Sequence, residues 1–198
     1  MNFDLNFLLS LLPGLVVGLT IHEASHALSA KWLGDRTAEK MGRISLNPLD
    51  HFSPTGFLAF FLLGFGWGKP VIVNLYNFKK PRFHYLLTSL AGPASNLLVA
   101  CISLALLYLH PTGMLRNALK SIFLINCLLA TFNLLPIPPL DGSKIWPCLI
   151  PGMKPAFSGK TNLIWVGVVI IGLYSGAVDR IITPVLTFVH SLIPALPG

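Results

Sequence analysis

The sequence contains few charged residues. Of its 198 residues only 11% are Asp, Glu, Lys or Arg, while 54% are hydrophobic. Soluble domains carry about 25% charged residues, so the composition excludes an ordinary soluble protein and predicts a polytopic membrane protein. Acidic residues are half as frequent as basic ones, 7 against 14, and the formal net charge is +7. Because the few basic residues lie in short loops between apolar runs, basic cytoplasmic loops explain this charge better than binding to nucleic acid does.

Cysteine is also scarce. The three cysteines are odd in number and show no CxxC spacing, so we interpret them as free thiols rather than a disulfide framework. No low-complexity segment, internal repeat or long linker divides the chain. We expect a single membrane-embedded domain over residues 1–198, with its core at 5–142 and a C-terminal span and tail at 162–198.

Long apolar runs are abundant, and they set the expected fold. A membrane-spanning helix needs about 20 residues, and four runs are read as spans: 5–33, 83–109, 115–135 and 162–178. The glycine-rich run 54–67 is too short to span comfortably and is expected to be re-entrant. Residues 42–47 and 71–76 have the alternation or the β-branched bias of short strands. The predicted fold is an all-α polytopic membrane protein with about four transmembrane helices, a re-entrant segment and small β-strands.

The distribution of basic residues predicts the orientation. If 54–67 crossed the membrane, the basic loops 31–43 and 69–82 would face opposite sides, contrary to the positive-inside rule. If that run is re-entrant, eleven of the fourteen Lys and Arg residues face the cytoplasm. The N-terminus then lies outside a multi-pass protein of the cell membrane. The first and third spans both end at the cytoplasmic side, so residues near those ends are expected to meet there.

One charged motif interrupts the first apolar run: His22-Glu23-Ala24-Ser25-His26. Residues four apart lie on one face of a helix, so the two histidines can present nitrogens to a single metal ion. Glu23 then lies beside the metal, where a general base for an activated water is needed. Titratable groups are costly in a hydrophobic helix and indicate function by default. Two histidines hydrogen-bonded within a helix bundle are the alternative interpretation.

Asp141 follows the third span, after three prolines that stop its helix. The expected topology brings this carboxylate to the same leaflet as His22 and His26. A His-His-Asp set with water in the fourth position suits catalytic zinc, because catalytic sites keep one position open. The other interpretation of Asp141 is an ordinary helix-end acid.

Three separated motifs together resemble the site-2 protease family of intramembrane zinc metalloproteases. They are HEASH (22–26), AGPASN (91–96) and FNLLPIPPLDG (132–142). The resemblance implies one Zn²⁺ held by His22, His26 and Asp141 with a catalytic water, and Glu23 as the general base. It also implies that GWGKPV (66–71) begins an edge strand that holds the substrate extended. No insertion is large enough for a PDZ domain, so the chain resembles the compact form of the family.

The same resemblance implies transmembrane proteins as substrates and the lipid bilayer as surroundings. The expected function is hydrolysis of peptide bonds within or near transmembrane segments, in regulated intramembrane proteolysis. Asn96 and Asn133 are candidates for substrate binding or for an oxyanion donor, with interhelical hydrogen bonding as their equally open alternative. The segment 42–51 also resembles a family segment, but Ser53 stands where an acid commonly follows.

A transmembrane divalent-metal transporter is the competing function, because zinc permeases also carry an HExxH-like sequence in a membrane helix. Here Ala27 follows the motif instead of a further acid, and no second span carries ligand residues. A catalytically inactive membrane adaptor is a third possibility. The presence of all three ligand residues together with Glu23 argues against it.

Overall fold

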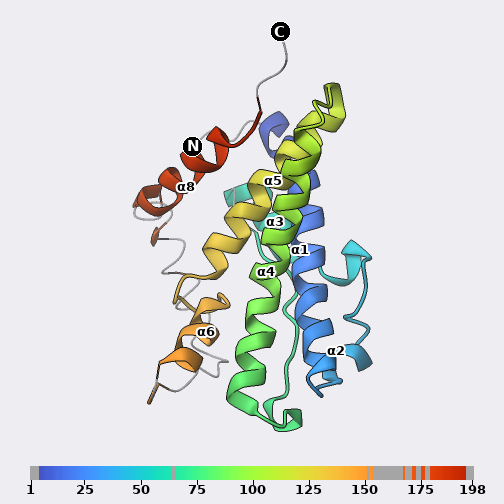
Figure 1. Cartoon of the computed structure of the whole chain (residues 1–198), viewed down its shortest axis with the longest axis vertical. Coiled ribbons are helices and arrows are strands. Elements are labelled where there is room, and N and C mark those ends of the chain that lie inside the picture. Colours follow the sequence, from blue (N-terminus) through green and yellow to red (C-terminus); the bar gives the residue numbers. More distant parts are fainter. Residues whose placement is uncertain are drawn as a thin grey trace.

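The computed structural model describes residues 5–63, 66–150 and 179–194, with isolated positions at 152–153, 167, 171–172 and 175–176. In this part of the chain the elements are helical, and no β-sheet is formed. In order they are α1 (Leu5–Trp32), α2 (Thr37–Lys40), the 3₁₀ turn η1 (Pro48–Asp50), α3 (Pro54–Leu63), the 3₁₀ turn η2 (Leu75–Asn77), α4 (Pro81–Leu107), α5 (Gly113–Asn133), α6 (Gly142–Leu149) and α8 (Asp179–Ser191) (Figure 1).

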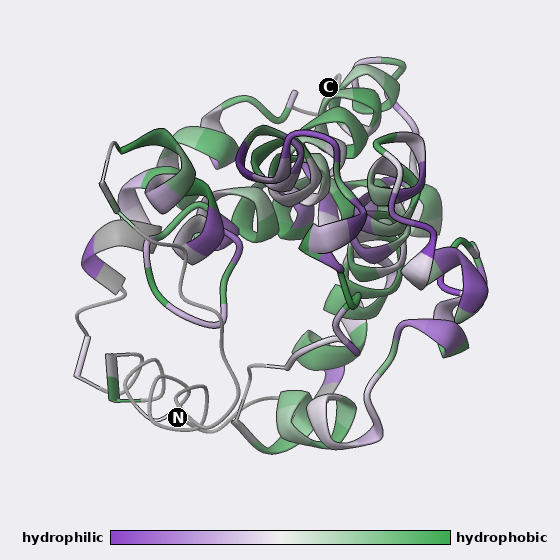
Figure 2. Ribbon diagram, turned by 90° about the horizontal axis from the view of Figure 1, so that it is seen from below, coloured by the Kyte–Doolittle hydropathy of each residue, from purple (hydrophilic) through white to green (hydrophobic). Residues whose placement is uncertain are grey.

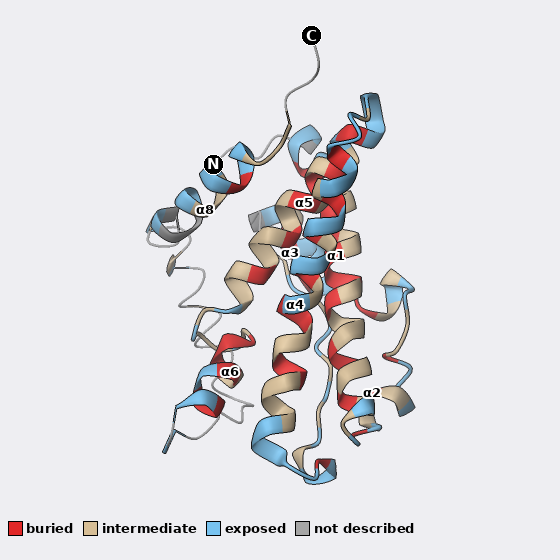
Figure 3. Ribbon diagram, viewed as in Figure 1, coloured by how far each residue is buried: buried red, intermediate tan, exposed pale blue. Residues whose placement is uncertain are grey.

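Three of these helices, α1, α4 and α5, are long and apolar enough to cross a membrane. They match the first three predicted spans, which are confirmed as membrane-competent helices. The predicted fourth span, 162–178, lies mostly outside the described residues. The three long helices pack against one another in pairs and run in alternating directions (Figure 1). Their buried positions recur along the faces that meet (Figure 3).

Small residues let α1 and α5 approach closely. A Cβ on Gly14 would lie 2.3 Å from the backbone oxygen of Ser121, so only glycine permits this separation. The Ser121 hydroxyl in turn accepts a hydrogen bond from the Gly14 amide at 3.1 Å. Because van der Waals packing and hydrogen bonds hold membrane helices together, such contacts set their relative position. They fix the helix that carries HEASH against the helix that leads to Asp141.

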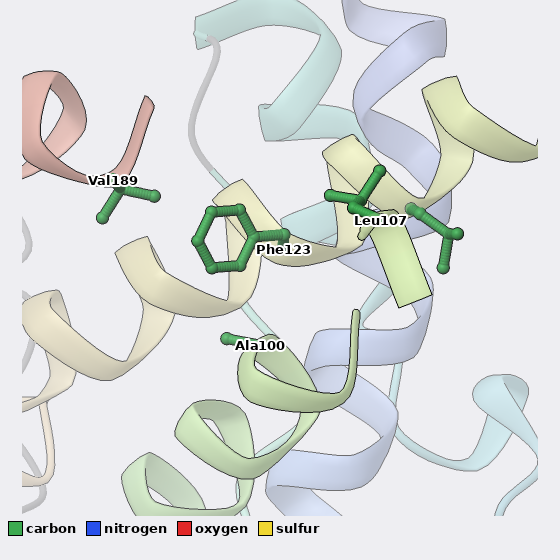
Figure 4. Close-up of a cluster of buried hydrophobic side chains, with 5 residues drawn as sticks. Ala100, Leu107, Phe123 and Val189 are labelled. Carbon is green, nitrogen blue, oxygen red and sulfur yellow. The ribbon is translucent and has the colours of Figure 1, made fainter. Parts of the chain in front are cut away.

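Helix α8 packs on the end of the bundle farthest from α6. Val189 of α8 shares a buried apolar cluster with Ala100 and Leu107 of α4 and Phe123 of α5 (Figure 4). The 13 residues of α8 correspond to about 20 Å of helix, less than the roughly 30 Å hydrocarbon core of a bilayer. The tail that follows the predicted fourth span therefore contains a helix too short to span by itself.

From α2 the chain rises to α3, which lies in the upper half of the bundle as drawn, and then returns to the start of α4 (Figure 1). At the base of this excursion Phe52 and Gly68 form an isolated antiparallel β-bridge. The Arg43 guanidinium donates to the carbonyls of Asp50, on the entering side, and Lys69, on the returning side. With 10 residues, α3 is about 15 Å long. Its path has the form of the predicted re-entrant segment, whose relation to a bilayer stays a prediction.

The predicted strands at 42–47 and 71–76 are wrong. Both stretches lack regular structure, and the second runs into the turn η2. A β-branched sequence favours extended backbone, but a strand needs a partner to share its hydrogen bonds. The Asn74 amide instead donates to Asp35 Oδ2 at 2.7 Å, and Asn77 Nδ2 donates to Asp35 Oδ1 at 2.7 Å. The buried Asp35 carboxylate thus joins the end of α1 to the segment before α4.

The polar loops gather at one end of the bundle. Because α1 and α4 are antiparallel neighbours, the end of α1, helix α2 and the start of α4 lie together (Figure 1). Seen from that end, the ribbon around α2 is hydrophilic (Figure 2). The described loops that supply most of the basic residues therefore share one end, as the charge distribution predicts, while Arg116 and Lys120 lie at the start of α5.

Candidate metal centre

Three potential metal ligands meet between α1 and the start of α6. His22 and His26 lie one helical turn apart on α1, and their Nε2 atoms are 3.0 Å from each other. Asp141 Oδ2 lies 3.1 Å from His22 Nε2 and 3.0 Å from His26 Nε2. All three side chains are buried. The structure therefore brings together the three residues that the sequence singles out.

The proton on His22 is fixed by a buried amide. Asn96 Nδ2 donates to the Gly18 carbonyl at 3.1 Å and to Asn126 Oδ1 at 2.8 Å. Both amide donors are thereby used, and the orientation places Asn96 Oδ1 2.6 Å from His22 Nδ1. Since a carbonyl oxygen can only accept, His22 must donate through Nδ1. Its Nε2 is then an unprotonated lone pair directed at His26 and Asp141 in the neutral imidazole.

The His26 ring is fixed in the same way. Its Nδ1 lies 2.7 Å from the Thr88 backbone oxygen, so it donates there and leaves Nε2 free of a proton in the neutral ring. Two lone pairs and a carboxylate oxygen then converge in a buried space. They repel one another unless a cation lies among them.

The donor set fits zinc. Imidazole and carboxylate are ordinary zinc ligands, and bonds of about 2.0–2.1 Å hold tetrahedral ligands roughly 3.3 Å apart. The three donor atoms are 3.0–3.1 Å apart, so a small movement accommodates the ion. Each histidine also has the second hydrogen bond that orients metal-bound imidazoles.

Gly92 of α4 is required by the closeness of the imidazoles. A Cβ at this position would lie 2.4 Å from His26 Nε2 and 2.6 Å from His22 Cε1. Such separations are too short for non-bonded atoms, and the atoms that a Cβ would meet belong to the rings of the two ligand histidines. The glycine of the AGPASN motif therefore has a direct physical reason.

A cavity of about 480 Å³ adjoins the three ligands. Glu23 lines it, and a Cβ on Gly68 would lie 3.3 Å from Glu23 Oε1. The returning segment after α3, including Trp67 and Val71, forms one wall. The GWGKPV motif thus follows the cavity as chain without regular secondary structure, beside the residue predicted to be the base. The residues predicted to hold the substrate and to activate water share one space.

The two predicted asparagines occupy different places. Asn96 is fully buried behind His22, and both of its N–H groups are engaged as described above, so its observed contacts orient the histidine. Asn133 lines the cavity, and its Nδ2 donates to the Leu129 carbonyl at 3.0 Å. A role of either amide in substrate binding or as an oxyanion donor stays a prediction.

Sequence reasoning missed Lys144, which it counted only as a basic loop residue. Lys144 Nζ lies 2.8 Å from Asp141 Oδ1, and the lysine lines the cavity. Burial acts to lower the pKa of Lys144, but the Asp141 carboxylate outweighs it and leaves that pKa above its usual value. Burial likewise acts to raise the pKa of Asp141, but the positive charge of Lys144 helps to hold it well below its usual range. The sequence did contain one signal for this ion pair: Lys144 follows Asp141 by three residues, a spacing at which side chains meet on a helix.

Replacing Asn96 by Leu should weaken zinc binding about 10- to 100-fold, as loss of an outer hydrogen bond to a ligand histidine typically does. Leucine has a similar size but cannot accept the proton of His22 Nδ1. Chelator competition on the purified protein measures the change. Ser103→Ala is the control, because that buried hydroxyl on the same helix donates to the Val99 carbonyl of its own helix and is not among the residues around the metal ligands. Unchanged zinc affinity in Asn96→Leu would contradict the assigned tautomer.

Known proteins provide an independent comparison. The family profile described as "Peptidase family M50" matches residues 110–174. "Putative zinc metalloprotease YwhC" from Bacillus subtilis is 45% identical over 165 residues, covering 76% of this chain and 75% of YwhC. The chain belongs to peptidase family M50. This membership confirms the resemblance to the site-2 protease family.

Two more distant relatives are also named as zinc metalloproteases. "Putative zinc metalloprotease Rip2" from Mycolicibacterium smegmatis is 30% identical over 152 residues, which cover 73% of this chain and 57% of Rip2. "Putative zinc metalloprotease MJ0611" from Methanocaldococcus jannaschii is 34% identical over 92 residues, 46% of this chain and 48% of that relative. This chain thus spans little more than half of Rip2. No solved structure matches it.

Proposed function

We propose that this family M50 chain is an intramembrane zinc metalloprotease that hydrolyses peptide bonds within or near transmembrane segments. One observation carries the proposal: the Nε2 atoms of two histidines and a carboxylate oxygen converge within 3.1 Å of one another beside a cavity lined by Glu23. The three helices around this site have membrane-spanning length. The names of the family relatives, which describe zinc metalloproteases, support the same activity.

His22, His26 and Asp141 are the residues that would hold one zinc ion. When bound, zinc supplies a Lewis acid that acidifies a water molecule and polarises the scissile carbonyl. Glu23 accepts a proton from the attacking water and passes it to the leaving amine as the peptide C–N bond breaks. The hydrogen bonds from the two Nδ1 atoms keep both imidazoles in the orientation that this chemistry needs.

The substrate must arrive at the site as extended chain, because a helical peptide bond is already hydrogen-bonded within its own helix. The segment 66–73 lies along the cavity and next to Glu23. Apart from the bridge between Gly68 and Phe52, it forms no β-pairing with other described residues. Pairing of an unwound substrate segment with this edge would satisfy the backbone groups of both. The proposed substrates are therefore membrane proteins whose transmembrane helices unwind locally.

The proposed location is the cell membrane, with the site toward the cytoplasm and the N-terminus outside. The clustering of the described basic loops at the end of α1, near the site, supports this orientation through the positive-inside rule. Irregular backbone at membrane depth is tolerated where it lines a protein-walled cavity, as segment 66–73 does here.

The test uses the full chain purified in detergent, with a model single-span membrane substrate. Zinc content and substrate cleavage are measured before and after metal removal by a chelator, and after zinc is restored. One zinc per chain, cleavage that disappears with the metal and returns with it, and products cut in the transmembrane region are the expected results. Bound zinc without cleavage, together with zinc flux in liposomes, would instead establish the metal transporter.

A further inference from the structure

The two oxygens of Asp141 have different partners. Oδ2 faces both histidines, at 3.1 and 3.0 Å, whereas Oδ1 lies 2.8 Å from Lys144 Nζ. The Asp141 side chain is 5% exposed and that of Lys144 is 34% exposed. Lys144 and Asp141 both line the cavity, so the ion pair lies at the cavity wall. Lysine bonds the oxygen that the histidines do not face.

This division matters because a carboxylate can bind a metal through one oxygen or both. A catalytic zinc site needs three protein ligands and one open position. If both oxygens of Asp141 reached the metal, the second would compete for the position that water or substrate must occupy. A charge-assisted hydrogen bond to Oδ1 opposes that arrangement, because it is among the strongest hydrogen bonds in proteins.

We propose that Lys144 is a positioning residue that restricts Asp141 to a single metal-ligand oxygen and so keeps one coordination position open. The inference rests on the proposed metalloprotease function and assigns a residue that acts through Asp141. Its positive charge also offsets the negative charge that Asp141 and Glu23 place around the cavity. A lysine suits this task because its ammonium is a compact charge with three donors.

The fold holds Lys144 where this role needs it. Helix α6 begins against the end of α5, where a Cβ on Gly142 would lie 2.4 Å from the Leu134 carbonyl oxygen. Trp146 Nε1 donates to the same carbonyl at 2.8 Å, and Arg82 of α4 donates to carbonyls at the end of α6. With α6 anchored at both ends, a residue one turn after Asp141 meets its carboxylate. Rigid supporting elements of this kind are what precise sites require.

The experiment compares wild type with Lys144→Met, Lys144→Gln and Lys144→Arg in the full chain in detergent. Each protein is loaded with cobalt(II), whose visible absorption distinguishes four-coordinate from higher-coordinate sites, and separately with zinc for kinetics on the model substrate. Lys31→Met is the matched control, because Lys31 also pairs with an acid, Glu39, at 2.7 Å, outside the cavity lining. Thermal melting identifies any variant that fails to fold.

The expected result is a cobalt spectrum shifted toward higher coordination in Lys144→Met and Lys144→Gln. Zinc-dependent kcat should fall about 10- to 100-fold, the usual cost of losing a ligand's outer partner, with little change in KM. Lys144→Arg, which keeps a cationic donor, should retain the wild-type spectrum and most of kcat. Lys31→Met should resemble wild type in both measurements.

A wild-type cobalt spectrum in folded Lys144→Met or Lys144→Gln would overturn the proposal, whatever the effect on kcat. A rise in KM with an unchanged spectrum would show instead that Lys144 contacts the substrate. Absence of proteolysis in wild type would count against the proposed function alone, because the cobalt spectra would still decide how Asp141 binds the metal.

Discussion

Replacing Glu23 by Gln is expected to reduce substrate cleavage by about 10²- to 10⁴-fold, the typical contribution of a general acid–base residue. Glutamine keeps the size of the side chain but cannot accept a proton from water. Glu23 lines the cavity beside Gly68 and lies outside the group of three converging ligand atoms. Zinc content should therefore stay at the wild-type level. Cleavage of the model membrane substrate and zinc content, measured on the same preparation, check both parts.

The matched control is Glu39→Gln, which removes a carboxylate of α2 that pairs with Lys31 and Arg36. The pKa of Glu39 is lowered to about 2 by hydrogen bonds from Arg36 and Lys31, so the control variant removes an ionised carboxylate. It should cleave like wild type, because this ion pair is on the exposed polar end. Substantial proteolysis by Glu23→Gln would falsify the assignment of Glu23 as the base. Loss of zinc in that variant would show that Glu23 supports the ligands.

Adding a single methyl group at Gly92 should destroy the metal centre although no ligand is removed. In Gly92→Ala the new Cβ would lie 2.4 Å from His26 Nε2 and 2.6 Å from His22 Cε1. Either the imidazoles rotate away from Asp141 or α4 moves away from α1. Both outcomes break the hydrogen bonds that orient the ligands, so we expect zinc affinity to fall at least about 100-fold, the upper range for lost ligand support. Cleavage should be lost at ordinary zinc concentrations.

Chelator competition and zinc content measure the effect of Gly92→Ala. Ala94→Val is the control, because it adds two methyl groups to an exposed position of the same helix and should leave zinc binding unchanged. Similar melting temperatures of the two metal-free variants would separate a local effect on the ligands from general loss of packing. Wild-type zinc affinity in Gly92→Ala would mean that α4 does not lie this close to the imidazoles.

The wrong strand prediction shows which kind of inference from sequence is weak. Residues 71–76 have strand-like side chains, but strand formation depends on a partner elsewhere in the chain. The hydrogen bond from the Asn74 amide goes to Asp35, and nothing in the local pattern announces that distant carboxylate. The segment lines the cavity, but the predicted strand is not formed with the other described residues.

The sequence by itself determined the local and periodic features. The spacing of His22 and His26 places both on one helix face, since any helix puts residues four apart together. Apolar length predicted α1, α4 and α5, because the bilayer sets the length of a spanning helix. The distribution of basic residues placed Asp141 at the same end as the histidines, and the structure brings the three together.

Tertiary structure alone decided how those side chains are held. The proton positions on the histidines depend on Asn96 and on the Thr88 carbonyl, which are distant in sequence and reach the rings only through the packing of α4 on α1. The necessity of Gly92 and the contact between Lys144 and Asp141 have the same origin. Such contacts depend on distances of a few ångströms between separate helices, and residue spacing within one segment does not specify those distances.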